Sequence, residues 1–251
     1  MENFFTESAH SKAFAFFVLL SVCVIQLVLL IFSRKMVGIA EDKDSISPER
    51  LQLKRFLSLK LFGFLIMGII PFIIFYILRG PDHYFLKPGS ATWQIPGFLI
   101  PAIPALILFI NFFAAGKNEF YARFPQMRIS EWGIPNLLIS IFGWGIYLVG
   151  YEYLFRGLFL SAWVQAFGPT TAILVNVVIY SLAHIPNGVK EAIGAVPFGI
   201  ILCLLTIQTG SFVTAFLLHW VLSASAEIFS VHHHPEMQFN LKKIYLWKDI
   251  S

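Results

Sequence analysis

Long apolar runs separated by short polar segments occur along the whole chain. Seven of them approach or exceed the ~20 residues that an α-helix needs to cross a hydrocarbon core of about 30 Å. They run over residues 13–32, 56–78, 93–114, 136–166, 170–187, 192–207 and 211–231. This pattern predicts an all-α fold, a polytopic transmembrane helical bundle of about seven spans.

Two of the runs have features that predict irregular helices. The third contains Pro96, Pro101 and Pro104, which we expect to kink it or to break it into a shorter piece. The fourth is long enough to tilt or to project from the bilayer. The first run exceeds the about 7–15 apolar residues of a secretion signal, so we expect a retained helix there.

Composition supports a membrane protein. Hydrophobic residues make up 57% of the 251 residues and charged residues only 13%, which excludes an ordinary soluble globular domain. The formal charge of +4 fits basic loops that face anionic lipid headgroups. The bilayer is therefore the expected partner, and nothing in the charge pattern predicts binding to nucleic acid.

The positions of the basic residues predict the orientation. Segments 33–55, 115–134, 188–191 and 232–251 carry 13 lysines and arginines, whereas the alternating segments carry 3. The positive-inside rule then places the C-terminus in the cytoplasm and the N-terminus outside. We expect an integral protein of the plasma (inner) membrane.

Polar residues inside the apolar runs gather in the second half of the chain. We therefore divide the chain into N-terminal helices and loops (1–135), a core that carries the chemistry (136–231) and a short cytoplasmic tail (232–251). In the core, Glu152 and Arg156 stand four residues apart, so they share one helix face and can pair. Alone, such a pair could simply lock one helix to its neighbours.

A second polar pair, Tyr180 and His184, is placed to meet the first. The turn signal between spans four and five is Gly168–Pro169. A helical hairpin folded about Gly168 sets Glu152 opposite His184 and Arg156 opposite Tyr180. Both pairs then lie roughly 21 Å below the turn at 1.5 Å per residue, in the cytoplasmic half of the bilayer.

The seventh span carries a third polar stripe. His219, Ser223 and Glu227 follow one another at intervals of four residues, so they share one face of that helix. Each could be an isolated interhelical hydrogen bond. Three polar helix faces of this kind nevertheless predict one polar site between spans 4, 5 and 7.

At these residues the sequence resembles the CPBP family of intramembrane proteases, also called the ABI family, which includes the CAAX prenyl endopeptidases. The family pattern is Glu-Glu-x-x-x-Arg, then Phe-x-x-x-His, then His-x-x-x-Asn or another small polar residue. The corresponding stretches here are YEYLFRG from Tyr151, YSLAH from Tyr180 and HWVLS from His219. The resemblance covers about residues 136–231.

The resemblance implies an intramembrane endopeptidase that hydrolyses a peptide bond of a membrane-associated protein or of a prenylated or leader peptide. It implies catalytic roles for Glu152, Arg156, His184, His219 and Ser223, with Tyr151 and Tyr180 near the substrate. A glutamate would activate water, and the histidines would stabilise the oxyanion. A divalent metal such as zinc is left open; if one binds, its ligands would be Glu152, His184 and His219.

The sequence departs from the family pattern at three positions. Tyr151 replaces the first glutamate, Tyr180 replaces the phenylalanine of the second motif, and Ser223 replaces the asparagine. Glu152 is then either the working base or only the partner that positions Arg156. The alternative to a protease is a catalytically impaired relative that acts as a membrane interaction or bacteriocin-immunity protein. A small transporter is a third reading, against which the lack of internal repeats argues.

Overall fold

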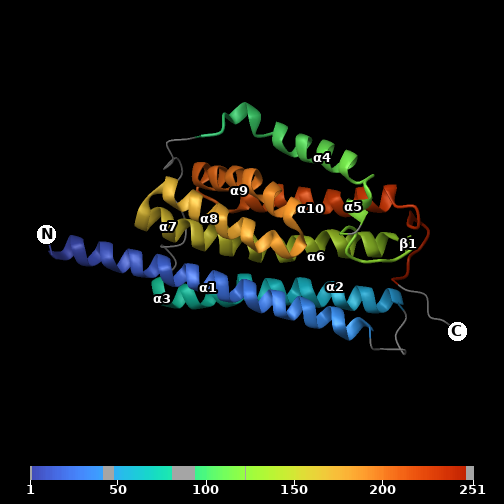
Figure 1. The fold of residues 1–251 in the computed structure, drawn as a ribbon, viewed down its shortest axis with the longest axis horizontal. Coiled ribbons are helices and arrows are strands. Elements are labelled where there is room, and N and C mark those ends of the chain that lie inside the picture. Colours follow the sequence, from blue (N-terminus) through green and yellow to red (C-terminus); the bar gives the residue numbers. More distant parts are fainter. Residues whose placement is uncertain (1, 42–47, 81–93, 122, 247–251) are drawn as a thin grey trace. The chain divides into compact units, whose positions relative to one another are not determined.

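The computed structural model describes residues 2–41, 48–80, 94–121 and 123–246. It is helical almost throughout (Figure 1). Within the described residues, seven helical segments are long and apolar enough to cross a membrane, which confirms the predicted polytopic helical bundle. They are Ala9–Met36, Glu49–Leu78, Gly97–Ala114, Ile134–Phe167, Pro169–Asn187, Val189–Thr209 and Val213–His233.

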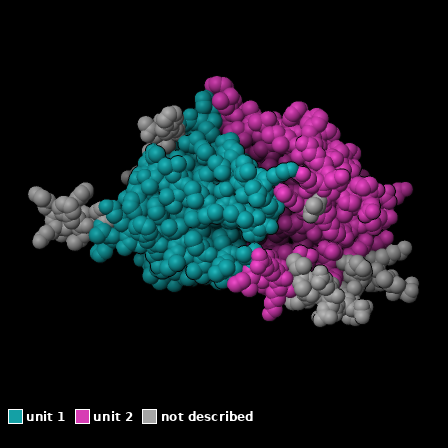
Figure 2. Space-filling view, in the orientation of Figure 1, with its two compact units in different colours: residues 1–30, 65–97, 149–217 teal, residues 31–64, 98–148, 218–251 magenta. Residues whose placement is uncertain are grey.

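The chain forms two compact units, coloured teal and magenta in Figure 2. Unit 1 comprises residues 1–30, 65–97 and 149–217, and unit 2 comprises residues 31–64, 98–148 and 218–251. In both units many large apolar side chains face outward, such as Ile77 in unit 1 and Phe109 in unit 2. Exposed apolar surface on this scale is what a helix presents to lipid.

The first two spans are long helices. They contain α1 (Glu2–Glu41), α2 (Pro48–Phe64), a π-helical segment η1 (Leu65–Ile69) and α3 (Ile70–Arg79). The third span begins with a 3₁₀ turn (Gly97–Leu99) and continues as α4 (Ala102–Ala114). Its break falls among the prolines that predicted one.

The fourth span changes its helical type within the motif region. It consists of α6 (Ile134–Glu152), a second π-helical segment η4 (Tyr153–Phe159) and α7 (Leu160–Phe167). The two π-helical segments, η1 and η4, contact each other within unit 1. π-helical turns are uncommon and are found frequently at functional sites.

The remaining spans are joined by short turns. They are α8 (Pro169–His184), which is followed by a 3₁₀ turn η5 (Ile185–Asn187), α9 (Val189–Thr209) and α10 (Val213–His233). Gly168 adopts a φ of 79°, which a residue with a Cβ rarely does, and Pro169 then starts α8 with its φ already fixed. The Gly168–Pro169 signal therefore marks a sharp turn, as predicted.

The described residues of the tail, up to Leu246, make defined contacts within unit 2. Within unit 2, β2 (Gln238–Phe239) pairs in parallel with β1 (Glu131–Trp132). Lys243 then forms an ion pair with Glu49 at 3.2 Å and donates to the carbonyl of Glu131. A short helix, α5 (Asn118–Tyr121), completes the elements of this unit.

Candidate active site

Glu152 and Arg156 form a buried ion pair in unit 1. Glu152 is the last residue of α6, and Arg156 lies in the middle of η4. Their side chains are fully buried, and Arg156 Nη1 lies 3.1 Å from Glu152 Oε2. Removing one partner from such a pair leaves an uncompensated buried charge, so each side chain requires the other.

Tyr180 links this ion pair to His184. The guanidinium of Arg156 lies over the Tyr180 ring at 4.2 Å from its centroid, and the Tyr180 and His184 rings are 4.5 Å apart. His184 Nδ1 is 2.8 Å from the backbone oxygen of Tyr180. Because a carbonyl oxygen only accepts, this contact requires a proton on Nδ1 and makes Nε2 the acceptor of a neutral ring.

Tyr151 makes a ring contact with His184. The Tyr151 ring lies 6.4 Å from the His184 ring and stacks on Phe155 at 4.6 Å. The prediction that Arg156 faces Tyr180 is correct, and the prediction that Glu152 lies opposite His184 stays a prediction. The π-helical segment η4 lies between these motif residues and the turn at Gly168, and such a segment changes which side chains face the neighbouring helix.

Asn176 connects α8 to this π-helical segment. Its Nδ2 donates to the backbone carbonyl of Phe155 at 2.8 Å, and its Oδ1 accepts from the Cys203 thiol at 3.3 Å. Both contacts are buried. The wider turn of the π-helical segment takes the Phe155 carbonyl out of the regular α-helical hydrogen-bond pattern. In an apolar interior a donor from a neighbouring helix helps to satisfy this carbonyl, and Asn176 supplies it.

His219 and Ser223, the third motif, belong to unit 2. Both are buried in α10, with 7% and 6% of their surfaces exposed. Glu227, the last residue of the same stripe, is also buried and accepts four hydrogen bonds. His219 and Ser223 lie in unit 2, whereas the other two motifs lie in unit 1, so the convergence of all three motifs on one site stays a prediction.

Lys60 is a buried basic side chain in the first half of the chain. We expected the chemistry to lie in the core, residues 136–231, which does not contain this lysine. Its Nζ lies 2.9 Å from the centroid of the Trp144 ring and also faces Phe56 and Tyr147. The signal was present in the sequence, since a lone lysine inside an apolar span is rare and often functional.

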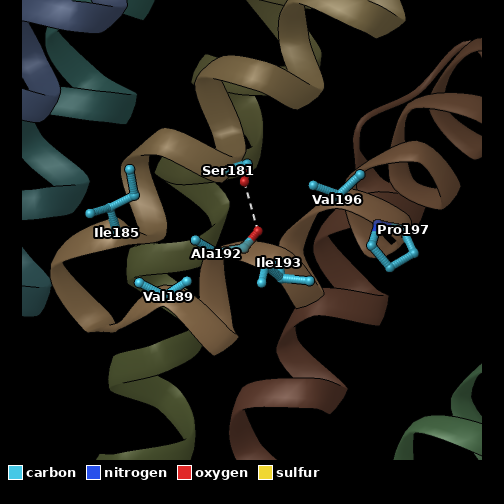
Figure 3. Close-up of a pocket in the computed structure, with 7 residues that line it drawn as sticks. All are labelled: Ser181, Ile185, Val189, Ala192, Ile193, Val196 and Pro197. Carbon is cyan, nitrogen blue, oxygen red and sulfur yellow. Dashed lines mark hydrogen bonds between the residues drawn. The ribbon is translucent and has the colours of Figure 1, made fainter.

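An apolar groove of about 480 Å³ lies between α8 and α9, next to His184 in the chain (Figure 3). Its lining residues are Ser181, Ile185, Val189, Ala192, Ile193, Val196 and Pro197. The single side chain among them with a polar atom, Ser181, donates its hydroxyl to the Ala192 carbonyl at 2.6 Å. The groove therefore presents hydrocarbon almost exclusively.

The described residues contain no group of three or more His, Cys, Asp or Glu side chains arranged to hold a metal ion. Within unit 1, the carboxylate of Glu152 is engaged by Arg156. The assignment of Glu152, His184 and His219 as ligands of a divalent metal thus stays a prediction, and the mechanism proposed below uses no metal ion.

Residues 132–225 match the family model described as type II CAAX prenyl endopeptidase Rce1-like. We refer to residues 132–225, which are similar to that family, as the Rce1-like segment. It contains all three polar motifs in order and overlaps most of the predicted core, which confirms the resemblance inferred from the motifs. The match covers less than half of the chain. No curated protein and no solved structure gives a significant match.

Proposed function

We propose that this protein is an intramembrane endopeptidase that hydrolyses a peptide bond of a membrane-associated protein or of a prenylated or leader peptide. The observation that carries the proposal is the Rce1-like segment, which contains Tyr151–Arg156, Tyr180–His184 and His219–Ser223 in the order of the family motifs. A CAAX-type protease segment within a helical membrane protein supports hydrolysis inside or at the surface of the bilayer.

His184 is the group we assign to water activation. It is the last residue of α8, close to the turn at Gly188, and its side chain is half-buried. With Nδ1 donating to the Tyr180 carbonyl, Nε2 is the ring nitrogen whose lone pair can accept a proton from water. The water oxygen then attacks the scissile carbonyl, and the protonated ring returns the proton to the leaving amine.

Glu152 acts in this proposal as a positioning residue. Of the two roles that the sequence leaves open, its complete burial against Arg156 favours the second, because a water-activating base must touch water. The pair holds Tyr180 through the guanidinium, and Tyr180 in turn holds His184. By similarity to the family, His219 and Ser223 donate to the developing oxyanion.

The groove between α8 and α9 is the region we assign to the apolar part of the substrate. Ser181 of α8 and Ile185 of η5 line it, and they lie three residues before and one residue after His184 in the chain. Its volume falls within the roughly 300–1,000 Å³ of small-ligand sites. A hydrocarbon chain or an apolar peptide segment in this groove brings an attached peptide to the face that carries His184.

The decisive experiment is a double-mutant cycle on the ion pair in reconstituted proteoliposomes. The variants are Glu152→Gln, Arg156→Gln and the double variant, assayed against a prenylated CAAX-type peptide and a leader peptide. If the pair only positions Tyr180, each single variant loses cleavage because it leaves a buried charge, and the double variant recovers part of it.

A catalytic glutamate predicts a different pattern. Glu152→Gln and the double variant would then be equally inactive, with losses on the order of 10²- to 10⁴-fold, and our assignment of Glu152 would be wrong. His184→Ala and His219→Ala are expected to abolish cleavage while the variants keep wild-type melting temperatures. Normal cleavage by both histidine variants would refute the assignment of catalysis to His184 and His219, and a wild-type protein that cleaves neither peptide would refute the endopeptidase function.

A second candidate function is that of a catalytically impaired relative, which acts as a membrane interaction or bacteriocin-immunity protein. Tyr151 favours it specifically: the position of the first glutamate holds a buried phenol that stacks on Phe155. This candidate predicts that the wild-type protein cleaves neither peptide and that the cellular phenotype survives His184→Ala. Loss of the phenotype in His184→Ala would exclude it.

A further inference from the structure

Glu227, two residues beyond the end of the Rce1-like segment, is the centre of a buried polar cluster in unit 2. Its Oε1 accepts from the backbone N–H of Gln126 at 3.0 Å and from Trp144 Nε1 at 3.1 Å. Its Oε2 accepts from Ser140 Oγ at 3.2 Å and from the same Gln126 N–H at 3.2 Å. One carboxylate on α10 is thus bound to α6 at two positions and to the loop before β1.

Trp144 couples this carboxylate to a buried cation. Its indole N–H donates to Glu227, and its ring face carries the ammonium group of Lys60. Lys60 and Glu227 are both almost fully buried. A carboxylate with several donors and a nearby cation is retained in an apolar interior because the charges are compensated, whereas either one alone is costly there.

The cluster restricts the rotation of α10. Successive residues of an α-helix are separated by about 100°, so Ser223 and His219 lie on the same stripe as Glu227. Two further contacts hold the helix: Asn111 donates to Ser225 at 2.7 Å on another side of α10, and Trp220, on the same side as Glu227, donates to the backbone of Ile141 in α6 at 2.8 Å. Of these three anchors, Glu227 is the one that carries charge and binds two separate segments.

We propose that Glu227 is a positioning residue: its clamp on Gln126, Ser140 and Trp144 fixes the rotation of α10 about its axis and so sets the direction of His219 and Ser223. The inference rests on the proposed function only for the roles of His219 and Ser223 in catalysis. The rotational clamp itself is a property of unit 2 and can be measured without any catalytic activity.

The test uses cysteine labelling to report the rotation of α10 in proteoliposomes. In a background in which Cys23 and Cys203 are replaced by alanine, single cysteines are placed at Leu222, Ser223 and Ala224. Their labelling rates with a small methanethiosulfonate reagent are compared. Ser223 is buried, and its neighbours Leu222 and Ala224 are more exposed, so Ser223→Cys should react slowest.

Glu227→Ala should change this pattern. The rate at position 223 should rise relative to its two neighbours by on the order of fivefold to tenfold, because the released helix opens or rotates more easily. Glu227→Gln keeps an acceptor for Trp144 and Gln126 and should retain the wild-type order. Unchanged relative rates in Glu227→Ala would overturn the proposal.

Trp144→Phe decides the question if Glu227→Ala does not fold. It removes one donor to Glu227 and keeps an aromatic ring for Lys60, so a smaller change of the same sign is expected and an unchanged pattern overturns the proposal. Peptide cleavage is measured in parallel. A changed labelling pattern in a protein that never cleaves refutes the proposed function alone, whereas an unchanged pattern with impaired cleavage refutes the positioning role alone.

Discussion

Replacing Gly199 with alanine tests whether the Tyr180 ring is held as rigidly as the structure indicates. Gly199 lies in α9 directly against this ring. A Cβ at this position would be 2.9 Å from Tyr180 Cδ1, 3.4 Å from Cε1 and 3.5 Å from Val177 Cγ2. Carbon atoms prefer separations of about 3.5–4.0 Å, so the methyl group and the ring cannot both keep their positions.

The ring has little room to move away. Arg156 lies over it at 4.2 Å from its centroid, His184 at 4.5 Å and Phe155 at 5.8 Å. Overpacking of this kind costs about 1–3 kcal/mol. Replacing a helical glycine with alanine contributes up to about 1 kcal/mol in the opposite direction. We therefore expect Gly199→Ala to destabilise the protein by up to about 2 kcal/mol.

Gly194→Ala is the matched control. Gly194 lies in the same helix, and a Cβ there has no atom within 4 Å, so the propensity gain is unopposed. The two variants should differ in unfolding free energy by roughly 1–3 kcal/mol, which corresponds to several degrees in melting temperature at about 2–4 °C per kcal/mol. Unfolding in mixed detergent, followed by tryptophan fluorescence, measures the difference.

Equal stability of the two alanine variants would refute the close packing of α8 on α9. A further check is the pair Tyr180→Ala and Tyr180→Ala/Gly199→Ala. With the ring removed, the added methyl group meets no ring atom, so Gly199→Ala should no longer destabilise. A destabilisation that persists in the Tyr180→Ala background would assign the effect of Gly199→Ala to the helix backbone instead.

Three other predictions follow from single contacts. Asn176→Ala should destabilise by about 1 kcal/mol, since the buried Phe155 carbonyl loses its donor, and Asn176→Asp, which cannot donate when ionised, should not restore stability in the same unfolding assay. Lys243→Ala should speed amide hydrogen exchange in residues 238–246, whereas the exposed neighbour Lys242→Ala should leave it unchanged; equal rates in both would show that the tail is held by other contacts. Ile193→Trp should raise the KM for an apolar peptide substrate without lowering kcat, and an unaltered KM would remove the α8–α9 groove from substrate binding.

Much of the fold followed from the sequence because the bilayer restricts it strongly. Backbone groups in hydrocarbon must be bonded within the helix, so each apolar run of sufficient length becomes a span. The Gly168–Pro169 pair identified the hairpin, and counting outward from it placed Arg156 against Tyr180 correctly. The same count assumed a continuous α-helix through residues 153–159, where the structure has a π-helical segment that the sequence did not predict.

The candidate site was only partly accessible to sequence reasoning. The Tyr151–Arg156 and Tyr180–His184 motifs were recognisable because charged and polar residues stand out in apolar spans. The donors to Glu227 were not, since they come from a loop backbone, a serine and a tryptophan that carry no pattern of their own. Lys60 was visible as a charge in an apolar run, but its position on the Trp144 ring was not.

By itself, the sequence determined that the chain crosses the membrane about seven times, that its polar motifs occur in the order of an Rce1-like segment, and that the first motif glutamate is a tyrosine. These properties depend on residue type and local spacing. Only the tertiary structure decided that the Glu152–Arg156 pair is fully buried and that Tyr151 makes a ring contact with His184. Both depend on a π-helical segment and on contacts between helices, which arise from packing that local periodicity does not encode.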